Sequence, residues 1–330
     1  MEIAFDTSPL GQTRAGTARY VRGLLAELER APELTLQRHA FTLRSRAVVP
    51  VRDVGWYLGA LPLLASRADV LHCPTFRAPV RTHVPLIVTF HDLAVLRHPE
   101  TFNRWTRSYS RHALPRVARA ARRLIAVSEF TKRELLDLLD VPAEKVRVIP
   151  NAVGPQFSAE GEAEPGDYVL AVSTLEPRKN LPRLVEAYRR AGLNGMPLLV
   201  AGAAGWGGVS VEGDGVRWLG EVGDEQLARL YRGARAVAYV SLYEGFGLPV
   251  LEAMACGAPV VAARNEALEE VSAGAAVLVD PLDPDAIAAG LHEAIDRREE
   301  LRPLGLARAR AYDWHEVARQ TVAVYREAAA

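Results

Sequence analysis

Short apolar runs alternate with amphipathic helical patterns along the whole chain of 330 residues. This alternation predicts a parallel sheet with crossover helices. In the first half, strands are predicted near Ile3–Phe5, Leu36–Phe41, Val70–Leu71, Leu86–Phe90, Leu124–Val127 and Val146–Ile149. Helices are predicted near Gly16–Arg30, Asn103–Arg122 and Glu129–Leu139. Ser128 precedes the last helix and is a candidate N-cap.

A segment rich in proline, glycine and glutamate, Pro150–Gly166, interrupts this pattern. Beyond it, strands are predicted near Tyr168–Ser173, Leu198–Ala201, Val216–Trp218, Ala236–Val240, Val260–Ala262 and Ala276–Val279. The helices that go with them are predicted near Leu181–Ala191, Asp224–Gly233, Pro249–Cys256, Pro284–Arg298 and Trp314–Ala328. Two α/β units of similar size predict two Rossmann-like domains facing a cleft. We place a first domain at residues 1–154, a linker at 155–166, a second domain at 167–311 and a C-terminal helix at 312–330.

Composition sets limits on the class of protein. The formal net charge is zero, which gives no support to a nucleic-acid partner, and we expect none. Cys73 and Cys256 are far apart and have no redox or metal spacing, so a disulfide framework is not expected. The chain shows neither a signal-peptide pattern nor an apolar run of about 20 residues. We therefore expect a cytoplasmic protein.

One glycine-rich loop carries most of the functional inference. The stretch Tyr243-Glu-Gly-Phe-Gly-Leu-Pro-Val-Leu-Glu252 follows a buried strand and opens a helix that Gly257 and Pro259 end. A glycine loop at the carboxyl end of a parallel strand is where open α/β sheets bind ligands, and the helix N-terminus attracts phosphate. Glu244 and Glu252 are acceptors for the hydroxyls of ribose and sugar. The alternative for Glu252 is a solvated helix residue.

A second constellation, Glu176-Pro-Arg178-Lys179-Asn180, follows the first strand of the second half. Asn180 is a candidate cap for the helix that begins at Leu181. Arg178 and Lys179 would then lie beside a positive helix end and could neutralise a diphosphate. The alternative is a pair of ordinary surface cations.

These segments resemble glycosyltransferase family 4. Glu244 and Glu252, with seven residues between them, resemble the EX7E motif of its retaining members. Glu176–Asn180 resembles the family's E-x-R-K-N segment, and His91-Asp92-Leu93 resembles its H-D-L segment. The resemblance covers essentially the whole chain and is closest to bacterial mannosyltransferases of polysaccharide assembly. It implies the GT-B fold, with the acceptor in the N-terminal domain, the nucleotide sugar in the C-terminal domain, and a last helix that crosses back to the N-terminal domain.

The resemblance also implies roles for single residues. Glu252 would bind the ribose hydroxyls and Glu244 the donor sugar, while Arg178 and Lys179 hold the phosphates. The turn Gly245, Phe246, Gly247 and Leu248 would face the sugar and the diphosphate. His91 would approach the donor sugar, and Asp92 would orient its loop or the acceptor. Gly16 opens a helix where the family usually has two glycines, and it would approach the donor phosphate or the acceptor.

An arginine-rich stretch between Thr101 and Ser128 contains no acidic residue. Its members are Arg104, Arg107, Arg111, Arg116, Arg119, Arg122 and Arg123. One interpretation is a solvated helix face. The other is peripheral contact with an anionic membrane or a lipid-diphosphate acceptor, through Arg104–Arg123.

Together these features predict a retaining glycosyltransferase that moves a hexose from a nucleotide sugar, with GDP-mannose favoured, to a glycan or lipid-linked acceptor. No metal or other cofactor is expected, because no D-x-D pair stands at a strand end in the right setting. Asp283-Pro-Asp285 has the D-x-D pattern, but Asp283 looks like the cap of the helix that begins at Pro284. Catalysis would then rest on Glu244, His91, Arg178 and Lys179. The alternatives are a sugar-phosphate synthase, a nucleotide-sugar epimerase or a noncatalytic nucleotide-sugar-binding subunit. A Rossmann dehydrogenase would need a G-x-G-x-x-G turn that the N-terminus lacks.

Overall fold

The computed structural model describes residues 1–12, 16–43, 49, 51–193 and 195–330. The chain divides into two compact units, one formed by Met1–Ala152 with Asp313–Ala330 and the other by Val153–Tyr312. Each contains a six-stranded sheet in which every neighbouring pair of strands is parallel. The predicted α/β class with two parallel sheets is confirmed.

The sheet of the first unit has the order β2-β1-β3-β4-β5-β6. Its strands are β1 (Glu2–Asp6), β2 (Thr35–His39), β3 (Val70–Cys73), β4 (Leu86–Phe90), β5 (Arg123–Ala126) and β6 (Val146–Val148). The central strands β3 and β4 are buried along their whole length, as expected for parallel strands covered on both faces. All six strand predictions for this half therefore fall on observed strands.

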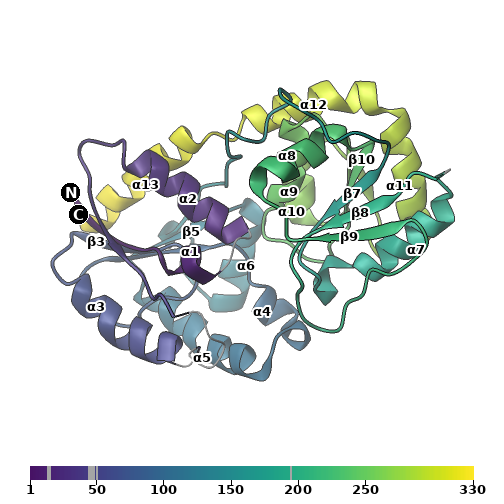
Figure 1. Ribbon diagram of the computed structural model, residues 1–330. Coiled ribbons are helices and arrows are strands. Elements are labelled where there is room, and N and C mark those ends of the chain that lie inside the picture. Colours follow the sequence, from purple (N-terminus) through teal and green to yellow (C-terminus); the bar gives the residue numbers. More distant parts are fainter. Residues whose placement is uncertain (13–15, 44–48, 50, 194) are drawn as a thin grey trace. The chain divides into compact units, whose positions relative to one another are not determined.

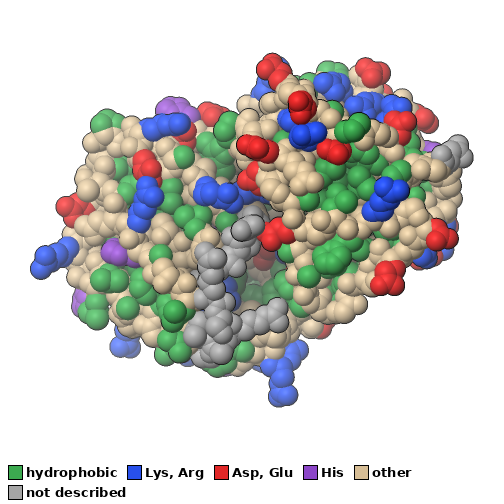
Figure 2. Space-filling view, in the orientation of Figure 1, with side chains coloured by type: hydrophobic (Ala, Val, Ile, Leu, Met, Phe, Trp, Pro, Cys, Tyr) green, Lys and Arg blue, Asp and Glu red, His purple; other side chains and the backbone are tan. Residues whose placement is uncertain are grey.

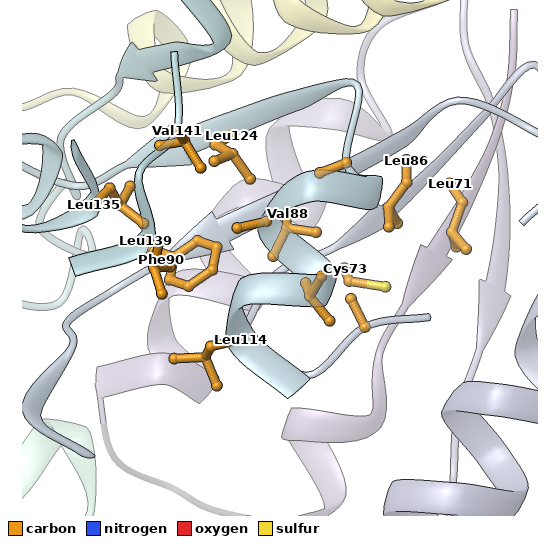
Figure 3. Close-up of a cluster of buried hydrophobic side chains, with 14 of the residues drawn as sticks. Leu71, Cys73, Leu86, Val88, Phe90, Leu114, Leu124, Leu135, Leu139 and Val141 are labelled. Atoms are coloured by element: carbon orange, nitrogen blue, oxygen red, sulfur yellow. The ribbon is translucent and has the colours of Figure 1, made fainter. Parts of the chain in front are cut away.

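Helices cover both faces of this sheet (Figure 1). They are α1 (Ser8–Gln12), α2 (Gly16–Leu28), the π-helical η2 (Val51–Ala60), α3 (Leu61–Leu64), α4 (Ala94–Arg97), η3 (Pro99–Thr101), α5 (Arg104–Ala120), α6 (Glu129–Leu139), η4 (Ala143–Lys145) and α13 (Trp314–Ala329). Figure 3 shows the core on one face, where Leu114 of α5 and Leu135 of α6 meet Val88 and Phe90 of β4. The Ser128 hydroxyl accepts a hydrogen bond from the Thr131 amide, which confirms the predicted cap of α6.

The C-terminal helix α13 packs on the other face of this sheet, against α2, β3 and β4. A glycine makes room for it, because a Cβ at Gly23 of α2 would lie 2.3 Å from the indole Cε2 of Trp314. Buried Tyr325 adds a polar tie, since its hydroxyl lies 2.7 Å from Nδ1 of His72 on β3. The last helix is therefore a structural part of the unit that holds the N-terminus.

The sheet of the second unit has the order β12-β11-β10-β7-β8-β9. Its strands are β7 (Val169–Val172), β8 (Leu198–Ala201), β9 (Val216–Gly220), β10 (Ala236–Tyr239), β11 (Val260–Ala263) and β12 (Val277–Val279). Its helices are η5 (Pro177–Lys179), α7 (Leu181–Ala191), α8 (Asp224–Gly233), α9 (Leu248–Ala255), α10 (Glu266–Ser272), α11 (Pro284–Asp296) and α12 (Arg298–Arg310). Leu184 of α7 and Leu291 of α11 pack together on one face of the sheet. Asp283 caps α11 through the Asp285 amide, as predicted.

Three details differ from the sequence predictions. Helices α10 and α12 were not predicted, because α10 has only two turns and α12 contains Pro303. The short helices α1, α3 and α4 and the π-helical η2 were also missed, because none of them has a long periodic pattern of apolar residues. The predicted side-chain cap by Asn180 is wrong. Its backbone is left-handed (φ 60°), and its side-chain nitrogen Nδ2 donates to the carbonyls of Val240 and Pro281.

Candidate active site

The charged loops of the second unit lie at the switch point of its sheet. Strands β7 and β10 are neighbours, and from them the chain builds the sheet outward in opposite directions. Arg178 and Lys179 follow the carboxyl end of β7, and Glu244 follows the carboxyl end of β10. Open α/β sheets bind ligands at this point, where the two diverging loops leave a crevice.

A buried ion pair joins the two loops. The Lys179 ammonium lies 2.5 Å from Oε1 of Glu244 and 2.9 Å from the Tyr239 hydroxyl, which itself donates to the same carboxylate oxygen at 2.8 Å. Burial alone would raise the pKa of Glu244, but Lys179 and Arg178 outweigh it and lower that pKa from 4.5 to about 2. Glu244 is therefore a carboxylate at neutral pH, although only 8% of its surface is exposed.

Arg178 ties a second carboxylate into the same cluster. Its Nη2 lies 3.0 Å from Oε1 of Glu176, and its Nη1 donates to the Tyr243 carbonyl at 3.1 Å and lies 3.5 Å from Oε2 of Glu244. The two cations thus face two carboxylates, and the four formal charges sum to zero. An anion that binds these cations must take over part of their pairing with Glu176 and Glu244.

The glycine turn after Glu244 depends on having no side chain at Gly247. Its backbone adopts φ 105°, and a Cβ there would lie 2.4 Å from Cδ2 of the fully buried Leu268. Helix α9 begins at the next residue, with Pro249 in its first turn, and Gly257 follows its end at φ 76°. The turn Gly245–Leu248 therefore presents a helix N-terminus at the sheet edge, which is the arrangement that favours phosphate.

Glu252 lies one turn into α9 and is buried, with 1% of its surface exposed. Its Oε2 accepts a hydrogen bond from the Tyr231 hydroxyl of α8 at 3.2 Å. Phe157 packs edge-on against the Tyr231 ring. The alternative of a solvated helix residue is therefore wrong. A buried carboxylate has several acceptor positions, so Glu252 can accept hydrogen bonds in addition to the one from Tyr231.

In the first unit, His91 follows the carboxyl end of β4. Its Nε2 lies 2.9 Å from the Pro74 carbonyl oxygen, which can only accept, so Nε2 carries the proton. Burial lowers the pKa of His91 below its ordinary value, and this outweighs the opposing effects of the Pro74 carbonyl and Asp92. The ring is therefore neutral at pH 7, with Nδ1 as the acceptor.

The neighbours of His91 fix its orientation. The ring of Tyr20 on α2 meets the His91 ring edge-on, with the ring centroids 4.8 Å apart. The Tyr20 hydroxyl lies 3.2 Å from Oγ1 of Thr89. Gly16, the first residue of α2, opens the helix that carries Tyr20; Ala15 before it lies outside the described residues. Asp92 accepts a hydrogen bond from the Ala94 amide at 3.0 Å, which orders the loop after β4.

Sequence reasoning missed a group of buried charges at the switch point of the first sheet, between β1 and β3. Asp6 ends β1 and accepts a hydrogen bond from the Tyr57 hydroxyl at 2.9 Å. Asp53 on η2 receives Arg77, which lies four residues beyond β3, and the indole N–H of Trp105. Asp6 could have been found from its place at the end of the first apolar run. Asp53 and Arg77 carry no local signal.

The chain matches two family models that together span most of its length. Residues 15–157 match Glycosyltransferase Family 4, and residues 155–307 match the model described as Glycosyl transferases group 1. A relative, the O-antigen chain mannosyltransferase B of Escherichia coli, is 31% identical over 92% of this chain and 82% of its own. The chain belongs to glycosyltransferase family 4. Another relative, the MMP alpha-(1->4)-mannosyltransferase of Mycolicibacterium hassiacum, is 35% identical over 65% of this chain and 56% of its own.

Solved structures place this family 4 glycosyltransferase in the GT-B fold. Sucrose-phosphate synthase from Thermosynechococcus elongatus matches with a TM-score of 0.82 at 20% identity, over 99% of this chain and 98% of that one. The Anabaena protein HepE in complex with UDP-glucose matches with a TM-score of 0.77 at 18% identity, over 99% and 100% of the two chains. The fold predicted from the resemblance is confirmed.

Within the ranges described, no three His, Cys, Asp or Glu side chains gather in a way that could hold a metal ion. None of the helices in those ranges is long and apolar enough to cross a bilayer.

Proposed function

We propose that this glycosyltransferase moves a hexose, with retention of anomeric configuration, from a nucleotide diphosphate sugar to a glycan or lipid-linked acceptor. The observation that carries the proposal is the switch point of the second sheet, where two partly buried cations and a helix N-terminus meet. Both groups favour a diphosphate. Mannose is the favoured sugar and GDP-mannose the favoured donor, because two of the relatives reported above carry mannosyltransferase names.

In this proposal, the residues of the second unit hold the donor. Arg178 and Lys179 stabilise the charge on the departing diphosphate, with the amides of the turn Gly245–Leu248 beside them. Glu244, freed in part from these cations when phosphate arrives, turns a carboxylate oxygen toward the sugar hydroxyls. Glu252, positioned by Tyr231, accepts hydrogen bonds from the ribose hydroxyls.

The first unit would hold the acceptor at the carboxyl edge of its sheet. Asp92 orders the loop that carries His91, and the neutral His91 contacts the donor sugar. The bond from the anomeric carbon to the diphosphate oxygen breaks, and a bond from that carbon to the acceptor oxygen forms on the same face. The acceptor proton passes to an oxygen of the leaving diphosphate, so no protein nucleophile is needed.

We propose that no metal takes part, because the two cations supply the positive charge that a metal would otherwise bring to the diphosphate. Turnover should then be unchanged in excess EDTA. Loss of activity in EDTA with recovery on adding Mg²⁺ or Mn²⁺ would reject this part of the proposal. Peripheral contact with an anionic membrane, where a lipid-linked acceptor would reside, also belongs to the proposal.

A thermal-shift screen with GDP-mannose, UDP-glucose and dTDP-glucose tests the donor site. A specific donor stabilises the folded protein by mass action and so raises its melting temperature. At a donor concentration one hundred times its Kd, the free energy of unfolding increases by about 2.7 kcal/mol. Arg178→Ala and Glu252→Ala should each abolish the shift, while Arg189→Ala, at an exposed residue of α7, should keep it. Wild-type shifts in both site variants would refute the site.

Product analysis then tests the reaction. With GDP-mannose and a glycan acceptor, NMR should show a new glycosidic bond with the anomeric configuration of the donor. An inverted product would refute retention. Sugar phosphate or a free epimer would identify one of the two alternative enzymes, and donor binding without turnover over many acceptors would identify a noncatalytic subunit.

A further inference from the structure

A groove of about 1150 Å³ lies at the opposite edge of the first unit's sheet from the proposed substrate residues. Its lining comes from segments that lead into strands, namely Val80–Leu86 before β4, Arg119–Arg123 before β5 and Pro142–Lys145 before β6. Because all these strands are parallel, their amino ends share one edge. His91 and Asp92 follow the carboxyl end of β4, so the groove is separate from them.

The lining of this groove is strongly cationic. Arg81, Arg119, Arg122, Arg123 and Lys145 contribute to it, and Glu144 is its one acidic member among the described residues. Arg123 is ion-paired with Glu327 at 3.1 Å, whereas the side chains of Arg81 and Arg122 have no hydrogen-bond or ion-pair partner in the described ranges. The Lys145 ammonium donates to the Arg119 carbonyl at 2.8 Å, and burial, with Arg123 nearby, lowers its pKa. The five cations therefore outnumber the acidic side chains near them, Glu144 and Glu327.

On the surface of the second unit, by contrast, arginine side chains are paired with acidic side chains. Figure 2 shows red and blue side chains mixed at the top of that unit. Among the ion pairs of this unit, Arg297 pairs with both Glu293 and Glu300, and Arg190 pairs with Asp285. Helix α5, whose C-terminal end lines the groove, has no acidic residue to do the same.

The outer wall of the groove is apolar and exposed. Leu58 of η2 and Leu63 of α3 line it with 48% and 70% of their surfaces exposed, and Leu64 beside them is 51% exposed. Val51 and Val54 of η2 are also about half exposed. Figure 1 shows α3 and α5 on the same side of the unit. Cations and outward-facing leucines in one place match an amphiphile with an anionic head, and a free phosphate or a nucleic acid would leave the leucines unused.

We propose that this groove binds the headgroup of an anionic phospholipid at a bilayer surface, with Leu58 and Leu63 entering the interfacial layer. This deepens the peripheral contact that is part of the proposed function. It assigns that contact to Arg119, Arg122 and Arg123 of the arginine-rich stretch and adds Arg81 and Lys145, which lie outside that stretch. Arg104, Arg107 and Arg111, nearer the start of α5, are not part of it.

Co-sedimentation with vesicles tests this site in the full chain. Binding should appear with vesicles of phosphatidylcholine and phosphatidylglycerol and be absent with phosphatidylcholine alone, and salt should weaken it. Each cation near an anionic surface contributes about fivefold to partitioning, so Arg81→Gln with Arg122→Gln should lower it about 25-fold. Arg104→Gln with Arg107→Gln, at exposed residues of α5 outside the groove, is the matched control and should change partitioning less than threefold. Leu63→Ser should weaken binding at every salt concentration.

Three results would overturn the proposal: equal binding to both vesicle types, an equal loss in the control variant, or full competition by free glycerol phosphate or short duplex DNA. The thermal shift with GDP-mannose distinguishes a failure of this proposal from a failure of the proposed function. Groove variants should keep the wild-type shift, and Arg178→Ala should keep wild-type vesicle binding. Failure of one assay therefore leaves the other conclusion standing.

Discussion

Removing the charge of Glu244 should reduce the stability of the second unit in a pH-dependent way. The Glu244→Gln change keeps the shape of the side chain but leaves buried Lys179 without its ionic partner at 2.5 Å. A pKa depressed from 4.5 to about 2 corresponds to about 3 kcal/mol of stability at pH 7. Burial lowers the pKa of the Lys179 ammonium, and this desolvation offsets part of the stabilising free energy. We therefore expect a loss of about 2–3 kcal/mol at pH 7.

The sign of the pH dependence follows from the direction of that pKa shift. Because folding lowers the pKa of Glu244, its contribution is fully present above the unfolded value of 4.5 and is lost as the pH falls through about 2. At pH 3 the wild-type advantage should have fallen to about 1 kcal/mol. The gap between wild type and Glu244→Gln should therefore narrow to about half between pH 7 and pH 3.

Urea-induced unfolding at both pH values, followed by circular dichroism, measures this gap. Glu225→Gln, at an exposed residue of α8, is the control and should change stability by less than about 0.5 kcal/mol. The reasoning is refuted if Glu244→Gln is as stable as wild type at pH 7, or if its deficit stays the same at pH 3.

Three further predictions concern single residues. Gly247→Ala should lower the stability by about 1–3 kcal/mol and remove the donor-induced thermal shift, because its Cβ would meet Leu268 at 2.4 Å; Gly223→Ala, with open space around its Cβ, is the control, and equal melting temperatures would contradict the strain argument. NMR of the imidazole nitrogens should show His91 neutral at pH 6.5 with the proton on Nε2, since burial lowers its pKa, and half-protonation at that pH would contradict this. Ser128→Ala should lower the stability by about 1 kcal/mol through loss of the cap on α6, and thermal unfolding indistinguishable from wild type would show that the cap contributes nothing.

Much of the fold could be predicted from the sequence because the central strands of both sheets are buried. Runs such as Val169–Val172 are apolar throughout, and every predicted strand falls on an observed one. Helices with a long apolar stripe were also predicted, and α6, α7 and α8 have the predicted bounds. The short helices α1, α3 and α4 were missed because four or five residues carry no measurable period.

The candidate site could be predicted only in part. The glycine turn and the pair Arg178–Lys179 are readable, because glycine and charge at a strand end are local signals. Their pairing with Glu244 is not, since it depends on β7 and β10 being neighbours although Glu244 lies 65 residues beyond Lys179. The Asn180 cap failed for a related reason, since its side-chain nitrogen donates to the carbonyls of Val240 and Pro281 and its side-chain oxygen accepts from the Arg183 guanidinium rather than from a backbone amide of α7.

The cationic groove shows the same limit more clearly. The arginine-rich stretch was visible, but the sequence alone left open whether it formed a solvated face or a binding surface. Only the fold brings Arg81 and Lys145 to Arg122, since these residues lie before three different strands. The exposed leucines of η2 and α3 belong to helices that the sequence did not predict.

The most direct test is a crystal structure of the protein with GDP-mannose. The account predicts that the diphosphate lies against Arg178, Lys179 and the amides of the turn Gly245–Leu248, with a ribose hydroxyl on Glu252 and the Lys179–Glu244 pair lengthened. A nucleotide bound away from the junction of β7 and β10, or a diphosphate at that junction with both cations still held by Glu244 and Glu176, would contradict it.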